Sequence, residues 1–196
     1  FSDVSAAGAI RSRTIRFYRA GAKLADLRFD AIGLLTAADP MQIEASSRVS
    51  YTPQGLPRWV MNGDLDGDLA AIGITGELTQ PFRATLSEGV LKALGTWGFT
   101  GKAHVFDFDL RAFGAGPLLG KVSGDLELGI DRQGYRASGT LDSSGLRAGA
   151  FNVAFDGSYA QRVLTARRIV LVHRGSGARV EASGDIGIVP DGPRLG

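Results

Sequence analysis

The sequence contains no cysteine and only two histidines among its 196 residues. Without cysteine the chain can form no disulfide, no thiolate metal site and no cysteine nucleophile. The two histidines, His104 and His173, leave little for a histidine-based metal site. The absence of thiols also suits an oxidising compartment, where a stray thiol is a hazard. We therefore expect neither a metal centre nor another cofactor.

Long hydrophobic runs are absent too. No stretch approaches the roughly 20 apolar residues that a membrane helix needs, and no signal peptide is present. The chain begins at Phe1 and stops at "DGPRLG", which we interpret as a segment of a longer protein whose membrane attachment lies elsewhere. We divide it into an uncertain leading segment (1–24), a single continuous repetitive β-segment (25–190) and a truncated end (191–196).

Signatures of catalysis are missing, since no GxSxG, HExxH, P-loop or GxGxxG occurs. In "DLDGDL" the carboxylates of Asp64, Asp66 and Asp68 alternate like the opening of a calcium loop. That loop needs a glycine where Leu69 stands and a glutamate where Thr75 stands. The alternation instead favours the outer face of a strand. We expect the protein not to be an enzyme.

A second pair of carboxylates lies in "HVFDFDL" at 104 to 110. Asp107 and Asp109 alternate with Phe106 and Phe108, which predicts the aspartates on the outer face and both phenylalanines on the inner face. As an acid–base pair the two carboxylates would need a cleft around them, and nothing in the sequence marks one.

Positive charge is modest overall, with a formal net charge of +2. The stretch from 162 to 181 is nonetheless basic, with five arginines and one glutamate, Glu181. Such a stretch could contact phosphate head groups or nucleic acid, but a solvated strand face explains it more simply. Aromatic motifs for stacking on RNA bases are missing, so we expect no nucleic-acid partner.

Glycine is abundant, with 28 residues where a typical chain of this length would have about half as many. Alternation of apolar with polar or small residues recurs throughout, as in "GAFNVAFDGSYA" at 149–160, and polar links such as "DRQG", "DSSG" and "RGSG" separate the runs. Short links of this kind join antiparallel strands. The pattern predicts an all-β chain of antiparallel strands.

The large apolar side chains at alternate positions of the predicted strands define a predicted inner face. On the outer face we expect charged residues, namely Glu44, Arg48, Asp64, Asp66, Asp125, Glu127 and Glu181. The predicted lining of the inner face is Phe29, Ile43, Val49, Tyr51, Trp59, Met61, Leu65, Ile72, Ile74, Leu78, Phe82, Leu86, Val122, Leu126, Leu128, Ile130, Tyr135, Leu141, Phe151, Val153, Phe155, Tyr159, Val180 and Ile186.

A short repeat accompanies the strands: a glycine, a polar residue, then Leu or Ile. It occurs in "NGDL", "TGEL", "SGDL", "SGTL" and "SGDI", with each glycine in phase with the apolar residues. Glycines at one level on successive strands would let a sheet bend into a U-shaped trough with an apolar interior. Ordinary bulges in a closed β-sandwich are the alternative.

Helical periodicity is nearly absent. The run "SEGVLKAL" at 87–94 could form two helical turns, but Gly89 disfavours a helix by about 1 kcal/mol, so we expect strand or loop. In the leading segment Ile15 and Phe17 alternate with Arg16 and Tyr18, which makes a strand there plausible.

Three stretches together resemble the TamB family, within the AsmA-like bridge proteins of the Gram-negative envelope. They are "WVMNGDLDGDLAAIGITGELTQPFRATLSEG" (59–89), "WGFTGKAHVFDFDLRAFGAGPLLGKVSGDLEL" (97–128) and "ASGTLDSSGLRAGAFNVAFDGSYAQRVLTARRIVL" (137–171). The resemblance spans roughly residues 25–190 and consists of glycine and aliphatic patterns.

The resemblance implies a taco-like β-groove that conducts phospholipid acyl chains across the periplasm to the outer membrane. The parent would be anchored in the inner membrane and would meet an outer-membrane barrel protein of the Omp85 type. On this hypothesis Phe151, Val153, Phe155 and Tyr159 face acyl chains. The competing hypothesis is a structural β-sandwich or adhesin-like module without a ligand, in which the same residues pack against one another.

Overall fold

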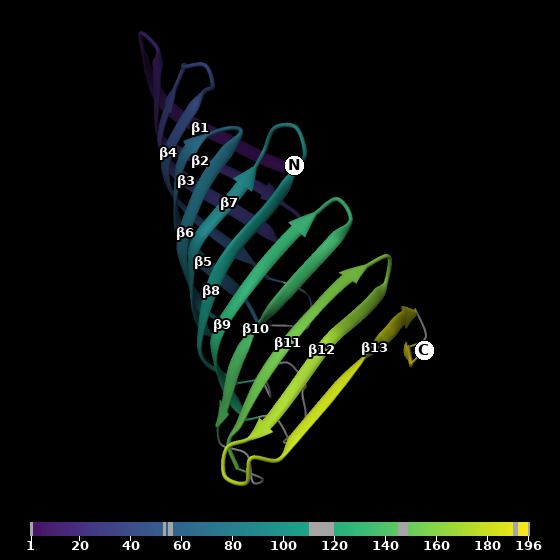
Figure 1. The fold of residues 1–196 in the computed structure, drawn as a ribbon. Helices are drawn as coiled ribbons and strands as arrows, with labels where there is room; N and C mark the ends of the chain where they lie inside the picture. The colour runs from purple at the N-terminus through teal and green to yellow at the C-terminus, as the bar shows by residue number, and fades with distance from the viewer. Residues whose placement is uncertain are drawn as a thin grey trace. The chain divides into compact units, whose positions relative to one another are not determined.

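The computed structural model describes residues 2–52, 54, 57–109, 120–144, 149–189 and 192–195. All regular secondary structure in these ranges is β-strand (Figure 1). The strands are β1 (Ser2–Arg11), β2 (Thr14–Leu24), β3 (Leu27–Thr36), β4 (Gln42–Tyr51), β5 (Trp59–Asp68), β6 (Ala71–Gln80), β7 (Arg83–Lys92), β8 (Gly98–Asp109), β9 (Lys121–Asp131), β10 (Gly134–Ser144), β11 (Phe151–Ala160), β12 (Val163–His173), β13 (Arg179–Val189) and β14 (Gly192–Leu195).

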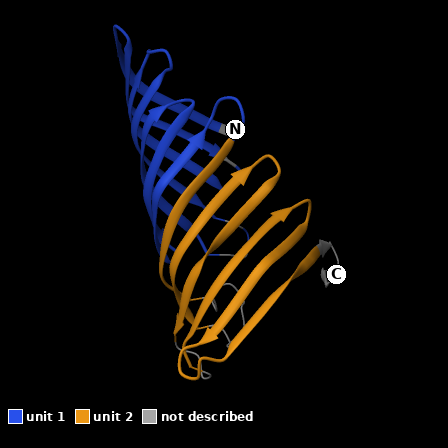
Figure 2. Ribbon diagram, in the orientation of Figure 1, with its two compact units in different colours: residues 1–97 blue, residues 98–196 orange. Residues whose placement is uncertain are grey.

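The chain divides into two compact units, residues 1–97 and 98–196 (Figure 2). In unit 1, β1 to β7 form an antiparallel meander in which each strand pairs with the next one along the chain. In unit 2, β8 to β14 do the same. The predicted all-β, antiparallel architecture is confirmed.

Each unit is a single open layer rather than a pair of packed sheets. Within each unit the strands that contact one another are sequence neighbours. In the described part of the chain no side chain is less than 2% exposed, whereas the core between two facing sheets would contain several such side chains. The open sheet agrees with the predicted groove-like fold and not with the closed sandwich.

The segments of ambiguous pattern are strands. Residues 2–24 form β1 and β2, and β2 pairs with β3 along its length, so the boundary expected at residue 24 falls inside a hairpin. The run 87–94 lies mostly in β7, as the strand-or-loop interpretation expected. A register shift between β6 and β7 accompanies a φ of 51° at Glu88, and this bulge explains the lack of clean alternation there.

One prediction about β8 is wrong. Phe106 and Phe108 were expected on the same face, but the pairing of β8 with β9 shifts register between Val105 and Phe108, where Asp107 has a φ of 45°. The extra residue keeps Phe108 in phase with Val105 and puts Phe106 on the opposite face. There its ring contacts the imidazole of His104, with 4.5 Å between ring centroids.

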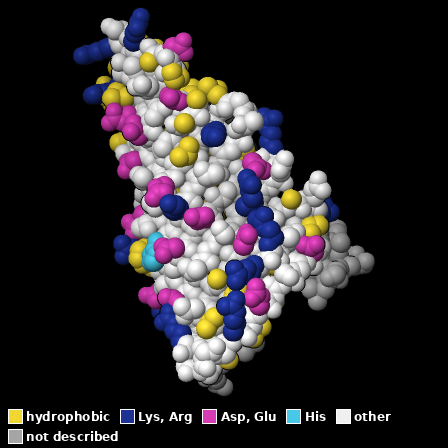
Figure 3. All heavy atoms as spheres, in the orientation of Figure 1, with side chains coloured by type: hydrophobic (Ala, Val, Ile, Leu, Met, Phe, Trp, Pro, Cys, Tyr) yellow, Lys and Arg dark blue, Asp and Glu magenta, His cyan; other side chains and the backbone are white. Residues whose placement is uncertain are grey.

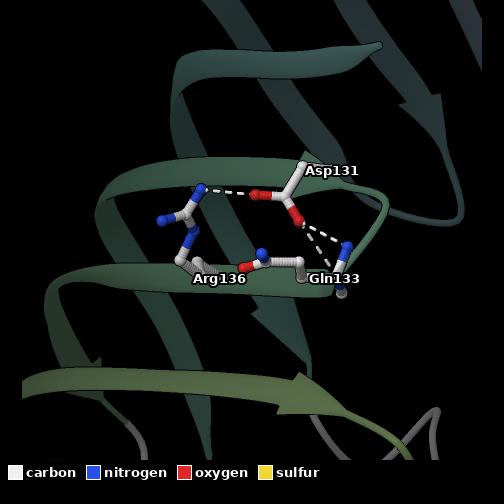
Figure 4. Close-up of polar contacts among 4 residues, drawn as sticks. Asp131, Gln133 and Arg136 are labelled. Carbon is white, nitrogen blue, oxygen red and sulfur yellow. Dashed lines mark hydrogen bonds and ion pairs between the residues drawn. The ribbon is translucent and has the colours of Figure 1, made fainter. Parts of the chain in front are cut away.

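Short polar turns connect the strands, and the β9–β10 turn shows how they are held (Figure 4). Asp131 Oδ1 accepts hydrogen bonds from the backbone N–H groups of Gln133 at 2.7 Å and Gly134 at 3.2 Å. Its other oxygen accepts one from the Arg136 guanidinium at 2.7 Å. The side chain therefore satisfies the donors of the turn, which is why an aspartate suits this position.

The repeated glycines lie in phase with the large apolar residues, as predicted. In unit 1, Gly63 is directly opposite Gly76. A Cβ on Gly63 would lie 2.7 Å from the carbonyl oxygen of Thr75, and one on Gly76 would lie 2.7 Å from that of Asn62. Both positions need glycine because the two backbones approach too closely for a side chain.

In unit 2 the glycines of the repeat are staggered between neighbouring strands. This differs from the expectation that they lie at one level on successive strands. Gly124 is opposite Leu141, while Gly139 is opposite Leu126 on one side and Phe155 on the other. Small and large residues therefore alternate across neighbouring strands, and each glycine leaves space that the facing side chain occupies.

Candidate functional site: two apolar sheet faces

The register gathers the predicted lining residues of unit 1 on one side of the sheet, which we call apolar face 1. Phe29 lies opposite Val49, Val49 opposite Met61, and Met61 opposite Leu78. Phe82 lies in the β6–β7 connection and contacts Trp59 edge-on, at 5.5 Å between centroids. The same pairings place on this face Ile43, Tyr51, Trp59, Leu65, Ile72, Ile74 and Leu86.

Unit 2 has an equivalent apolar face 2. Phe155 of β11 lies between Gly139 and Ile169, and Val153 lies between Leu141 and Leu171. The remaining predicted lining residues of unit 2 share this face: Val122, Leu126, Leu128, Ile130, Tyr135, Leu141, Phe151, Tyr159, Val180 and Ile186.

Sequence reasoning missed several members of these faces. They are Phe17, Leu35 and Leu91 in unit 1 and Phe99, Val105, Leu164, Ile169 and Leu171 in unit 2. Ile169 and Leu171 belong to the unbroken run "IVLV", which shows no alternation. Their phase follows only from their pairing with β11.

Both faces are open surfaces of half-buried hydrocarbon. Val122 is 5% exposed and Ile72 is 6% exposed, but Tyr135 and Val180 are 56% and 61% exposed. Neighbouring side chains on the same face shelter the inner positions, and within each unit no second layer of described residues covers the outer ones. Contiguous apolar surface of this kind is uncommon on soluble proteins and marks binding sites.

Aromatic side chains gather at the strand ends of these faces. In unit 1, Tyr51 ends β4 and lies directly opposite Trp59 at the start of β5. In unit 2, the rings of Tyr135 and Tyr159 lie 6.2 Å apart at one end of the sheet. At the other end Phe151 and His173 lie 5.0 Å apart. Tyrosine and tryptophan suit a boundary between hydrocarbon and water, because each has an apolar ring and a polar group.

The reverse side of each sheet has the charged side chains, together with some aliphatic ones such as Val60 and Val170. The register places there all seven charged residues that were expected on the outside. Charges of both signs are scattered over the face seen in Figure 3. Ion pairs with N–O distances of 2.7 to 3.1 Å join Arg28–Asp30, Arg83–Glu77, Arg167–Asp156, Arg168–Glu181 and Arg179–Glu181, and His104 Nδ1 lies within hydrogen-bond distance of Asp125 Oδ1 at 2.7 Å. These pairs are exposed, so each adds little stability.

Two carboxyl groups on the polar side have perturbed titration. The hydrogen bond from Arg179 to Glu181, with Arg168 nearby, lowers the pKa of Glu181. The hydrogen bond from Arg28 lowers the pKa of Asp30 in the same way. Both groups therefore stay ionised at neutral pH and hold positive side chains on the polar side.

Two shallow hollows lie mainly over the polar sides. One of about 810 Å³ in unit 1 is lined by Arg16, Glu44 and Asp64 among others. One of about 430 Å³ in unit 2 is lined by residues that include His104 and Asp125. An acyl chain in either hollow would contact charged groups, so these hollows do not suit hydrocarbon.

The described residues contain no group of three or more His, Asp or Glu side chains placed to hold a metal ion. Among the same residues there is no helix with the length and hydropathy of a membrane span. The candidate site therefore consists of the two apolar faces and their aromatic ends.

Comparisons of the chain with protein-family models, with characterised proteins and with solved structures found no match.

Proposed function

We propose that the apolar faces bind the acyl chains of phospholipids, and that the protein carries lipid across the periplasm for outer-membrane biogenesis. The observation that supports this most directly is the separation of residue types by the register. Every predicted lining residue that lies in a strand is on the apolar side of its unit, and the charged residues lie on the reverse.

The energetics favour such a role. Moving a CH₂ group into water costs about 0.8 kcal/mol, so exposing a sixteen-carbon chain costs on the order of 10 kcal/mol. An open apolar surface removes much of this barrier. Because the face offers hydrocarbon contacts and few polar partners, no single contact fixes the lipid, and a chain can slide along it.

The wider setting rests on the resemblance to the TamB family. Proteins of that kind are anchored in the inner membrane and meet an outer-membrane Omp85-type barrel. We extend both features to the parent of this chain as part of the proposal. The role is one of binding and conduction, without a catalytic step.

A photoreactive amino acid at single positions tests the proposal. Placed at Phe155 on apolar face 2 or at Leu65 on apolar face 1, it should form covalent adducts with phospholipid. Matched controls are Val172 and Ile32, which are also apolar but lie on the polar sides. Equal lipid adducts at all four positions, or none at Phe155 and Leu65, would contradict the proposal.

A further inference from the structure

Among the arginines of unit 2 whose side chains the structure describes, two lack a carboxylate partner. Arg132 and Arg162 are exposed, and within the described ranges neither forms an ion pair. The arginines of this unit that do pair with a carboxylate are Arg136, Arg167, Arg168, Arg174 and Arg179. The two unpaired guanidinium groups are therefore free to bind an anion.

The fold brings these two arginines to the same end of the sheet. Arg132 lies in the β9–β10 turn and Arg162 in the β11–β12 turn. Since β10 pairs with β11, with Tyr135 opposite Tyr159, both turns lie beside this tyrosine pair. The two hairpins are two strand spacings apart, roughly 10 Å. We call this end of unit 2 the arginine edge.

The carboxylate that precedes Arg132 in the chain does not neutralise the arginine edge. Asp131 precedes Arg132, but its two oxygens already accept hydrogen bonds from the turn and from Arg136 (Figure 4). The charge of Asp131 is therefore balanced by Arg136. Arg132 and Arg162 remain as excess positive charge.

At the opposite end of the same sheet, two positive side chains of the described residues have carboxylates at hand. There Arg174 forms an ion pair with Asp142, and Lys121 lies directly across from Asp109. Within the described ranges, unpaired arginines next to apolar face 2 are thus found at one end. An amphiphile with an anionic head and an apolar tail would be oriented by this asymmetry.

The dimensions suit such a ligand. Along β11, Tyr159 to Phe151 is eight residue steps, or roughly 26 Å of strand at about 3.3 Å per residue. One leaflet of a bilayer holds acyl chains in about half of a ~30 Å hydrocarbon core, or about 15 Å. An acyl chain that starts at Tyr159 therefore fits on the face before the strand ends.

We propose that the arginine edge binds the phosphate of a phospholipid whose acyl chains lie along the strands of apolar face 2. Arg132 and Arg162 hold the phosphate, and the rings of Tyr135 and Tyr159 lie at the boundary between head group and tail. This inference rests on the proposed function and adds the position and orientation of the bound lipid.

Two photoreactive phosphatidylglycerol probes test the inference with the 196-residue chain. A probe with the reactive group in the head should label peptides that contain the 131–134 and 160–163 turns. A probe with the group in the tail should label the middle of β9 and β11. In the Arg132→Gln/Arg162→Gln variant, head-group labelling should fall on the order of tenfold, since hydrogen bonds to a charged group contribute roughly this factor. Labelling by a tail probe on uncharged diacylglycerol should not change.

The matched control is Arg168→Gln/Arg179→Gln, which removes the same charge from the polar side. It should leave both labelling patterns intact, and the Arg132→Lys/Arg162→Lys variant should retain much of the head-group labelling. An equal loss in the control would show attraction by net charge alone and overturn the proposal.

Head-group labelling that is unaffected by Arg132→Gln/Arg162→Gln, with tail labelling intact, would refute the arginine edge and leave the proposed function standing. Absence of tail labelling would refute the proposed function. Binding of inorganic phosphate by these arginines without tail labelling would assign them to a free anion and overturn the inference.

Discussion

A charge placed on apolar face 2 distinguishes between two hypotheses for this face, an open lipid-binding surface and a covered core. Phe155 is the position of choice because it lies at the middle of β11, directly opposite Gly139 and Ile169. Phe155→Asp replaces a half-buried ring by a carboxylate in the path proposed for acyl chains.

The size of the stability loss follows from the exposure of this face. Truncating a fully buried phenylalanine costs about 3–5 kcal/mol. Phe155 is only half-buried, so the lost contacts should cost about 1–2 kcal/mol. On an open face the new carboxylate reaches water. In a covered core an unpaired charge would add a further ~3–5 kcal/mol and would unfold most of the domain.

Urea denaturation measures the stability, and lipid adducts at a neighbouring photoreactive position measure the effect on binding. Two controls isolate the charge on this face. Phe155→Ala removes the ring without adding charge. Val172→Asp adds the same carboxylate on the polar side, directly across from Arg179, where lipid adducts should be unchanged.

A folded Phe155→Asp protein with strongly reduced lipid adducts is the expected result. An unfolded protein would show that something covers this face. A folded protein with unchanged adducts would show that lipid does not pass this position.

Three further outcomes follow from the fold. Gly139→Ala should destabilise unit 2 by about 1–3 kcal/mol in urea melts, because the new Cβ would lie 2.2 Å from the backbone oxygen of Asp125. In the control Gly129→Ala the nearest atom to the new Cβ is 3.7 Å away, so stability should change by less than about 0.5 kcal/mol. The lowered pKa of Asp30 means that its pairing with Arg28 stabilises the fold above pH of about 4 and that this contribution disappears as the pH falls through the folded-state pKa. The melting temperatures of wild type and Asp30→Asn should therefore converge in acid, and a constant difference would contradict the pairing. The outer edge of β1 has no strand partner in the described residues, so light scattering should show association that grows with concentration.

Most of the fold was predictable because strand periodicity is simple. Side chains alternate with a period of two, so a run such as "GAFNVAFDGSYA" assigns each residue to a face before any pairing is known. The pairing of β11 with β10 and β12 then places Phe151, Val153, Phe155 and Tyr159 on apolar face 2.

Positions beyond a bulge were not predictable from alternation. A bulge inserts one residue and reverses the phase of everything that follows. This is why Phe106 and Phe108 lie on opposite faces of β8 although they are two residues apart. Alternation also fails to assign the residues of an unbroken apolar run to a face, since "IVLV" in β12 is apolar on both sides of the sheet.

The arginine edge lay beyond sequence reasoning for a different reason. In the sequence, Arg162 belongs to a single basic stretch from 162 to 181, and Arg132 lies 30 residues before that stretch begins. Whether a cation is free depends on which carboxylates lie within reach across the strands. Arg168 pairs with Glu181 of the next strand, while Arg162 in the turn has no such neighbour among the described residues. Predicting which arginines are unpaired therefore requires knowledge of the strand register.

The staggered glycines of unit 2 explain how a single layer can be stable while its apolar face stays open. A Cβ on Gly139 would lie 3.0 Å from Leu126 Cδ2, so the leucine side chain occupies space that a larger residue at 139 would fill. Leu126 and Phe155, on either side of this glycine, can bury part of their hydrocarbon against the sheet itself. The face thereby gains enough burial to fold without a covering layer, and its outer hydrocarbon stays accessible. A surface that conducts lipid needs both properties, because it must remain folded when empty and must offer apolar contacts when an acyl chain arrives.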